Sequence, residues 1–180
     1  MEYVRIPMNR VGVLIGKGGE VRKEIEERLK VKLGINAEEG IVTAENQGED
    51  VLAEWKARDV IRAIGKGLNP SKAMKLCSDD YALEIIELED FVGRSKKALL
   101  RQKARIIGRQ GKTRKYIEDM TKASISVFGK GVAIVGTLDE VQVAREAVVM
   151  LARGMPHSVV YKFLQRKARE LKEKRLSLWR

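Results

Sequence analysis

Two short glycine turns, each preceded by apolar residues, are the parts of this chain whose residue types could do chemistry. The first runs Leu14-Ile15-Gly16-Lys17-Gly18-Gly19 and the second runs Ile106-Ile107-Gly108-Arg109-Gln110-Gly111. Glycine permits a tight turn and lets the backbone approach a ligand closely. If each turn opens a helix, free backbone N–H groups and the helix dipole favour a phosphate there. We therefore treat residues 16–19 (the first loop) and 108–111 (the second loop) as candidate phosphate-binding loops.

The second loop lies inside the most basic stretch of the chain. A basic run alone is usually a solvated face, but the apolar residues and glycines embedded in this one argue against disorder. Residues 91–117 contain no Asp or Glu and ten basic residues, which are Arg94, Lys96, Lys97, Arg101, Lys103, Arg105, Arg109, Lys112, Arg114 and Lys115.

Side chains around each loop have distinct expected roles. The two middle residues of each loop should point outward, and Ile15 and Ile107 should anchor the loops to the core. Gly12 and Ala104 are small residues on the helices expected before the two loops. The candidate binding residues are Gly12, Gly16, Lys17, Gly18, Gly19 and Arg22 in the first copy, and Ala104, Ile107, Gly108, Arg109, Gln110, Gly111, Lys112, Arg114 and Lys115 in the second.

The two loops belong to a longer internal repeat. At an offset of 92 residues, Arg22-Lys23 matches Arg114-Lys115 and Ile25-Glu26 matches Ile117-Glu118. The same offset places the alternating Val31, Leu33 and Ile35 on Ala123, Ile125 and Val127, and Ile41-Val42-Thr43 on Ala133-Ile134-Val135. A repeat of this length predicts two copies of one domain.

Composition limits the classes of function. The 180 residues carry a net charge of +11, and no apolar run approaches the length of a membrane helix. Residues 1–68 hold 12 basic and 12 acidic residues, whereas residues 69–180 hold 24 and 13, so the second half should dominate contact with a polyanion. One cysteine and no signal peptide favour a reducing cytoplasm.

Catalytic interpretations find little support. One Cys (Cys77) and one His (His157) give no credible metal site, and we expect no cofactor. Cys77 is expected to pack and His157 to cap or be solvated. A nucleotide-binding loop at Gly16–Gly19 lacks the Gly-x-x-x-x-Gly-Lys-Ser/Thr pattern, and it lies between two helices, whereas a dinucleotide fingerprint follows a strand. We expect no enzyme.

Hydrophobic periodicity predicts the order β-α-α-β-β-α twice. In the first copy, a helix should open at Gly48-Glu49-Asp50, and its expected packing residues are Leu52, Trp55, Val60, Ile61 and Ile64. In the second, Ser95 to Lys103 should be an inserted basic helical segment before the loop. The remaining predicted elements are strands at 3–6, 31–35, 41–44, 83–88, 124–128 and 132–135, helices at 11–15, 20–29 and 112–121, a bridging helix at 71–77, a helix ending near Ala152, and a last helix with an apolar stripe of Val160, Leu164, Ala168 and Leu171.

With the apolar residues and Gly-x-x-Gly between the first two helices of each copy, the chain resembles tandem type I KH domains. The resemblance implies an α+β fold in which each three-stranded antiparallel sheet packs on helices, with domains at 1–68 and 83–154, a helical linker at 69–82 and a basic C-terminal helix at 155–180. It also implies that each groove clamps about four nucleotides of single-stranded RNA. The bases would lie against the small residues Gly12 and Ala104, and Ile35 and Val127 would form part of the opposite wall. A purely structural role for the first loop stays open, because that half is neutral and Glu20 stands where the second copy has Lys112.

A finer resemblance is carried by the run from Ile107 to Arg114 and by Gly154-Met155-Pro156-His157-Ser158-Val159-Val160-Tyr161. These residues resemble the archaeal relatives of the partner-of-Nob-one (Dim-two) and Krr-one ribosome-assembly proteins. That resemblance implies binding near the 3′ end of small-subunit ribosomal RNA (rRNA), cooperation with the endonuclease that matures it, and no membrane. Two alternatives stay open, a general translation or messenger-RNA binder and a protein-interaction scaffold that uses the first KH domain.

Overall fold

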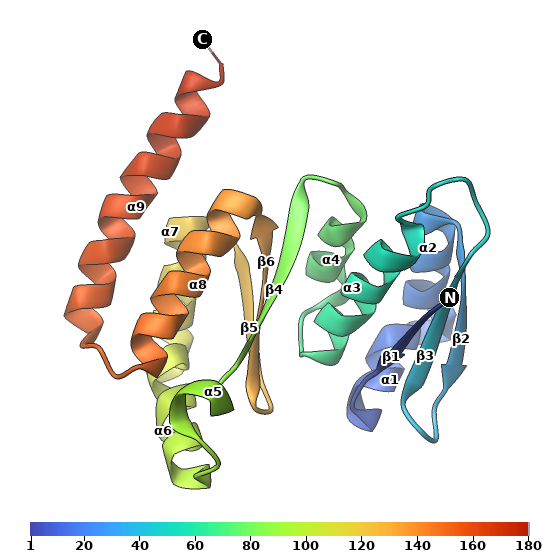
Figure 1. The fold of residues 1–180 in the computed structure, drawn as a ribbon, viewed down its shortest axis with the longest axis horizontal. Coiled ribbons are helices and arrows are strands. Elements are labelled where there is room, and N and C mark those ends of the chain that lie inside the picture. The colour runs from blue at the N-terminus through green and yellow to red at the C-terminus, as the bar shows by residue number, and fades with distance from the viewer. Residues whose placement is uncertain (180) are drawn as a thin grey trace. The chain divides into compact units, whose positions relative to one another are not determined.

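The computed structural model describes residues 1–179, which divide into two compact units, residues 1–83 and residues 84 onward. Both units contain the predicted order β-α-α-β-β-α (Figure 1). The first unit contains β1 (Glu2–Arg5), α1 (Met8–Ile15), a 3₁₀ turn (Lys17–Gly19), α2 (Glu20–Leu29), β2 (Val31–Asn36), β3 (Ile41–Asn46), α3 (Ala53–Gly65), α4 (Pro70–Ala73) and a second 3₁₀ turn (Met74–Cys77).

The second unit adds a short helix before the repeat and a long helix after it. Its first strand, β4, begins at Tyr81, just before the boundary between the units. Its elements are β4 (Tyr81–Glu87), α5 (Glu89–Val92), α6 (Lys96–Ile107), a 3₁₀ turn (Arg109–Gly111), α7 (Lys112–Thr121), β5 (Ser124–Phe128), β6 (Gly131–Thr137), α8 (Leu138–Ala152) and α9 (His157–Ser177).

Each sheet has three strands, with the last strand of the repeat in the middle. The orders are β1-β3-β2 and β4-β6-β5, so β2 and β5 are both edge strands. In both units the third helix of the repeat, α3 or α8, packs on the central strand. The buried core of the second unit includes Ile106, Ile117, Ile134 and Val148, which come from four different elements. The predicted α+β fold is confirmed.

The two copies lose the constant offset at the β2–β3 hairpin. Ile35 pairs with Val42 in the first sheet, and Val127 pairs with Val132 in the second. Val42 therefore corresponds to Val132 and not to Ile134, so the predicted register is wrong beyond this hairpin. Residues 37–40 connect the first pair of strands, but only 129–130 connect the second. A shift of two residues keeps every side chain on the same face of the sheet, which is why the sequence pattern hid it.

The predicted insertion Ser95 to Lys103 is also wrong as a separate segment. Ser95 is the N-cap of α6, where its hydroxyl accepts a hydrogen bond from the Ala98 N–H at 3.3 Å, and the helix then runs without a break to Ile107. α6 has 12 residues and α1 has 8, so the addition is one extra turn. The other additional residues form α5 and the turn that follows it.

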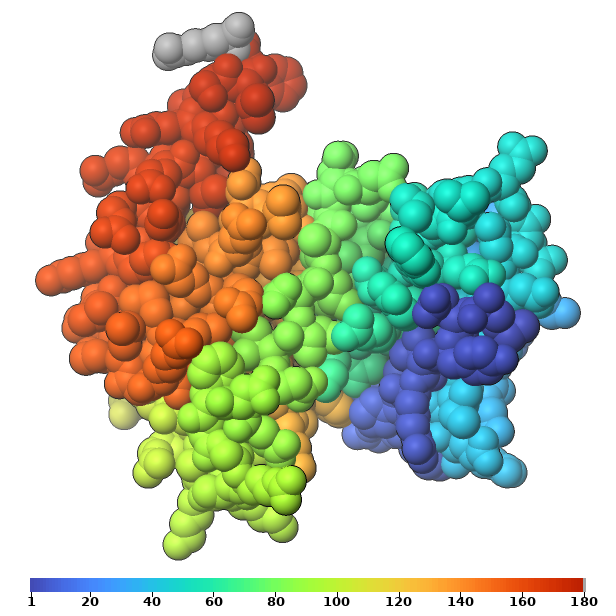
Figure 2. All heavy atoms as spheres, viewed as in Figure 1, coloured from blue at the N-terminus to red at the C-terminus, as the bar shows by residue number. Residues whose placement is uncertain are grey.

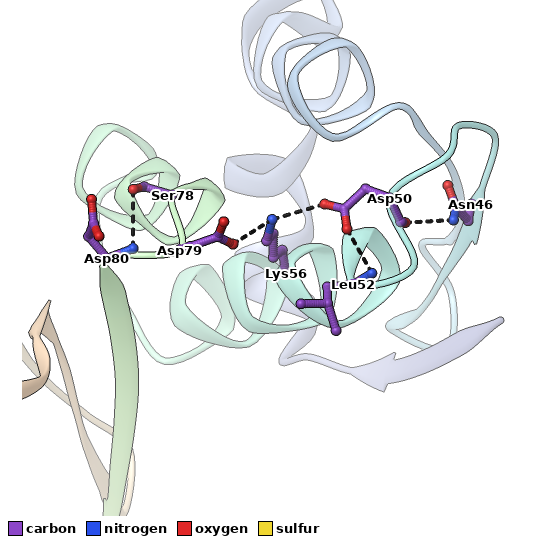
Figure 3. Close-up of polar contacts among 7 residues, drawn as sticks. All are labelled: Asn46, Asp50, Leu52, Lys56, Ser78, Asp79 and Asp80. Carbon is purple, nitrogen blue, oxygen red and sulfur yellow. Dashed lines mark hydrogen bonds and ion pairs between the residues drawn. The ribbon is translucent and has the colours of Figure 1, made fainter.

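The third helix of the first unit begins at Ala53, later than the predicted start at Gly48 to Asp50. A polar turn occupies the intervening residues (Figure 3). Asp50 Oδ1 accepts a hydrogen bond from the Leu52 N–H at 2.9 Å, and Asp50 Oδ2 pairs with Lys56 Nζ at 2.9 Å. Lys56 also pairs with Asp79 at 2.8 Å, and these carboxylates, Asp79 first, raise the pKa of its ammonium.

Leu52 and Trp55 were expected to pack in the core, but their exposed fractions are 43% and 55%. The other three predicted packing residues, Val60, Ile61 and Ile64, are buried, and Ala57 joins them on the buried stripe of α3. Trp55 lies off this stripe because it follows buried Ala53 by two residues, which is about half a helical turn.

One arginine in each unit ties the first helix of the repeat to the end of the third. Arg10 in α1 donates to the Ile64 and Leu68 carbonyls at 2.8 and 2.9 Å. Arg105 in α6 donates to the Leu151 carbonyl at 2.8 Å and to the Met155 carbonyl. Helix C-termini leave carbonyls without intrahelical partners, so each guanidinium caps a helix end. The offset of 92 would match Arg10 to Gln102. The second unit therefore forms the same cap with Arg105, about one helical turn after the equivalent position.

The last helix, α9, packs along α7 and α8. Its predicted apolar stripe is largely confirmed: Val160, Leu164 and Leu171 are buried, and Ala168 is half-buried. The final turns project past α8, as Figures 1 and 2 show, and there Leu178 and Trp179 are 79% and 90% exposed. No helix within residues 1–179 is long and apolar enough to cross a bilayer.

Candidate nucleic-acid interface

The two loops have nearly the same backbone. Gly16 and Gly108 have φ/ψ of 77°/173° and 76°/173°. Gly18 and Gln110 follow in the left-handed region at φ 62° and 54°, and Gly19 and Gly111 do so at 79° and 75°. In both copies the loop ends as the N-cap of the next helix, α2 or α7. The expectation that each loop opens a helix is therefore confirmed.

The first glycine of each loop is required by packing as well as by conformation. A Cβ added to Gly16 would lie 2.8 Å from the Val21 backbone nitrogen, and one added to Gly108 would lie 2.7 Å from that of Thr113. Both distances are shorter than any ordinary contact with a Cβ atom. The chain therefore passes directly against the first turn of the following helix. Gly18 and Gly111 have no such obstruction, because no atom lies within 3.4 Å of the place that a Cβ would take.

The residues before each loop divide between the core and the surface. Ile15 and Ile107 were predicted as anchors, but they are only half-buried. Leu14 and Ile106 are fully buried and anchor the loops instead. Ile15 and Ile107 therefore stay partly accessible to solvent beside the loops.

An exposed apolar stripe runs along the first helix of each repeat toward its loop. Met8 and Leu100 occupy equivalent positions and are 59% and 64% exposed. Four residues further on, Gly12 and Ala104 are also exposed, as was expected for small residues beneath a base. Sequence reasoning missed Met8 and Leu100. The offset of 92, applied to apolar residues outside the core pattern, would have found them.

Arg22 and Arg114 brace a helix against the open edge strand. Arg22 Nη2 donates to the Leu33 carbonyl at 2.7 Å, and the Leu33 N–H donates to Glu26 Oε1 at 2.9 Å. In the second copy the Ile125 N–H donates to Glu118 Oε2 at 3.3 Å, and Arg114 pairs with Glu118. These two predicted binding residues thus already have carboxylate partners, unlike the other cations near the second loop.

Most of the basic run makes no ion pair. Arg105 is occupied by its cap, and Arg114 is paired with Glu118. Within residues 1–179, no carboxylate pairs with the other eight cations of the run, which are Arg94, Lys96, Lys97, Arg101, Lys103, Arg109, Lys112 and Lys115. Most of them lie on α6, in the second loop or at the start of α7, where free positive charge and the helix dipole act together on an anion.

The positive charge around the first loop is weaker than that around the second. Lys17 projects from it, but Glu20 occupies the first turn of α2, whereas the first turn of α7 contains no acidic residue. Arg22 and Arg28 pair with Glu26 and Glu24 at 3.3 and 3.4 Å. The two loops thus share one backbone geometry and differ in charge.

The residues considered for catalysis have structural surroundings. His157 is the first residue of α9, and its Nε2 lies 3.0 Å from the Arg105 carbonyl oxygen. Burial raises the pKa of the Cys77 thiol, which keeps it protonated. No group of three or more His, Cys, Asp or Glu in the described part of the chain could hold a metal ion.

Comparison with known proteins assigns both repeats to KH domains. A family described as the eukaryotic type KH domain (KH-domain type I) matches residues 82–169, and the KH domain family matches residues 1–53. The KH domain-containing protein MJ0443 of Methanocaldococcus jannaschii is 51% identical over 100% of this chain and 79% of its own length. The pre-rRNA-processing protein PNO1 of Candida albicans is 30% identical over 95% of this chain and 63% of its own length.

Solved structures of archaeal Dim2p are also similar to this chain. Dim2p from Pyrococcus horikoshii is 48% identical, with a TM-score of 0.86 over 92% of this chain and 98% of that one. Dim2p in a complex of a/eIF2alpha, aDim2p and rRNA from the same organism is 47% identical, with a TM-score of 0.88 over 94% of each chain.

The close approach at Gly108 leads to a stability prediction. Gly108→Ala should lower the free energy of unfolding of the second domain by about 2 kcal/mol or more, because a new Cβ meets the Thr113 backbone and the positive φ adds strain. Gly111→Ala is the matched control, since only its positive φ of 75° opposes the change, and it should cost about 1 kcal/mol. Native-state hydrogen exchange of the α7 amides measures both values, and equal losses would contradict the packing argument.

Proposed function

The chain belongs to the family of two-domain KH proteins that includes archaeal Dim2p and the eukaryotic pre-rRNA-processing protein PNO1, and on that premise we propose that it binds single-stranded rRNA as an assembly factor of the small ribosomal subunit. The observation that carries the proposal is the second loop, whose backbone opens α7 among cations that have no carboxylate partner within residues 1–179. Free cations beside a helix N-terminus suit the phosphates of a nucleic acid strand.

The geometry supports a single strand in particular. The loop can hold the phosphates through its backbone, while Arg109 and Gln110 project outward. Leu100, Ala104 and Ile107 then offer an apolar wall for bases, as in KH grooves that hold about four nucleotides. Half-buried Val127 lies on edge strand β5, which the resemblance places on the opposite side of the groove. Unstacked bases can reach such a wall, whereas the bases of a duplex cannot.

We further propose that the strand belongs to the 3′ region of small-subunit rRNA and that the chain acts beside the endonuclease that matures this end, without catalysis of its own and in the cytoplasm. The support is the resemblance to the partner-of-Nob-one group, together with the role of PNO1 in pre-rRNA processing and the rRNA in the Dim2p complex.

Crosslinking in cells tests the proposed ligand. The protein is crosslinked with ultraviolet light, and the attached RNA is sequenced. Reads concentrated at the 3′ end of small-subunit rRNA are expected. Reads spread over messenger RNAs would instead support a general translation factor and would overturn the assembly role.

The two loops should contribute unequally to binding. Arg109→Asp with Gln110→Asp should abolish most single-stranded RNA binding, because both residues are exposed and two carboxylates would repel phosphate. Lys17→Asp with Gly18→Asp should weaken binding less, because the first loop already lies beside Glu20. Titration of both variants with one RNA gives the comparison, and circular dichroism checks that each stays folded. Equal losses of affinity would refute the unequal contribution of the two loops.

Binding should depend steeply on salt. A clamp on four nucleotides neutralises roughly three or four phosphates, which predicts a log–log slope of about −2 to −3 for single-stranded RNA. Free cations of α6 that reach a longer strand should steepen the slope to about −4. Replacing Lys96, Lys97 and Arg101 with alanine should then make the slope shallower by about two units at most, with little change in sequence preference, since phosphate contacts do not read bases.

The control removes three cations of the same domain that already have partners. Lys130, Arg145 and Lys174 pair with Glu89, Glu84 and Asp139. Their triple alanine variant should leave the slope near its starting value. If both triple variants shift the slope equally, net charge alone drives binding and the free cations of α6 have no special part.

A further inference from the structure

A second groove lies beside the second loop, on the side of α6 that faces α9. It is an open hollow of about 580 Å³, here called the α9 groove. Its lining comes from α6, the loop, the start of α7 and the first turns of α9, and the residues are Arg101, Ala104, Arg105, Gly108, Arg109, Lys112, Thr113, His157 and Tyr161. It is distinct from the proposed base wall of Leu100, Ala104 and Ile107, because of these three residues only Ala104 lines it.

Hydrogen bonds within the protein hold the walls of the α9 groove in place. The Thr113 and Tyr161 hydroxyls lie 3.1 Å apart, and His157 Nε2 lies 3.0 Å from the Arg105 carbonyl oxygen. The Tyr161 ring also packs on Tyr116, with ring centroids 4.4 Å apart. The principal polar atoms of the floor therefore have partners, and a ligand would meet aromatic rings, the Ala104 methyl group and the backbone of Gly108.

The rim of the α9 groove is cationic. Arg101, Arg109 and Lys112 are exposed, and none of the three makes an ion pair within residues 1–179. No acidic side chain among the described residues lines the groove. An apolar aromatic floor beneath free cations suits a ligand with a flat ring and an attached anion. Nucleotides have this composition, and stacking on aromatic side chains with backbone charge nearby is how proteins hold single strands.

The groove and the clamp share residues. Ala104, Gly108 and Arg109 line the α9 groove and also belong to the predicted contacts of the second loop. We propose that the α9 groove takes the nucleotide that continues the RNA strand past the four-nucleotide clamp, with its base against His157 and Tyr161 and its phosphate among Arg101, Arg109 and Lys112. The proposal rests on the proposed function, because it extends the same RNA site.

The first domain has no equivalent groove-forming helix among its described residues. Pro70 begins α4 and Pro156 precedes α9, each shortly after the third helix of its repeat. α4 has 4 residues, whereas α9 has 21, and residues 70–77 contain no aromatic side chain. The extra nucleotide should therefore be bound by the second domain alone.

The test compares a tetranucleotide with an octanucleotide that contains the same four central bases. Both are titrated against the full chain at low salt. Arg101→Glu should weaken octanucleotide binding about tenfold, because it removes a phosphate contact and adds repulsion, and should change tetranucleotide binding less than about twofold. Arg101 is exposed and has no ion pair within residues 1–179, so the fold should tolerate the change. Lys172→Glu, the same charge change on an exposed residue of α9 outside the groove, should affect both RNAs alike.

Crosslinking locates the extra nucleotide directly. Octanucleotides that carry 4-thiouridine at one position at a time are irradiated on the protein, and the crosslinked peptides are identified by mass spectrometry. One position outside the central four should attach to the peptide that contains His157 and Tyr161. Attachment should be lost in Arg101→Glu and kept in Lys172→Glu.

The outcomes separate the two proposals. A chain that binds neither RNA overturns the proposed function itself. Tight binding of the octanucleotide with no crosslink to residues 157–161, or an equal effect of Arg101→Glu on both RNAs, overturns the α9 groove alone. Binding of an acidic peptide that the octanucleotide cannot displace would assign the groove to a protein partner and would likewise overturn the extension.

Discussion

The contact between the first glycine of each loop and the following helix is the constraint on which both sites depend. Gly16 and Gly108 lie so close to Val21 and Thr113 that a Cβ at either position would overlap the backbone. This approach turns the chain sharply between two helices and presents the start of the second helix to solvent. Leu14 and Ile106 hold the turn from below in the core. The caps formed by Arg10 and Arg105 then join the first helix of each repeat to the end of the third. These hydrogen bonds hold the helix that precedes the loop in place.

One backbone design carries two electrostatic environments. The first loop repeats the second to within a few degrees at its first glycine, so geometry alone does not distinguish them. Nearby acids neutralise much of the charge around the first loop, whereas the second has cations without partners in the described chain and a helix, α9, packed beside it. The two loops therefore have the same backbone conformation but different surrounding charge, as the neutral and basic halves of the sequence indicated.

The sequence predicted most of the fold because its repeat combined glycine spacing with two kinds of hydrophobic periodicity. The predicted register was wrong at the hairpin between β5 and β6. A shift of two residues there leaves the alternation of buried and exposed side chains unchanged, so the sequence pattern does not reveal it. The sequence pattern also failed where a side-chain hydrogen bond set a boundary, as Asp50 does before α3. The contacts of His157 and Tyr161 with the residues around the second loop join positions about fifty apart in the chain, and no local pattern encodes such a meeting.

The free cations of α6 have a thermodynamic consequence for the domain that carries them. Lys96 and Lys97 occupy the first turn, where positive charge opposes the helix dipole, and Lys97, Arg101 and Arg105 follow one another at the four-residue spacing that places like charges together. No acid on this helix relieves the repulsion. A bound polyanion offsets this repulsion, so binding raises the stability of the domain. By the same linkage, any other interaction that offsets the repulsion in the free protein lowers the affinity for the polyanion by an equal free energy.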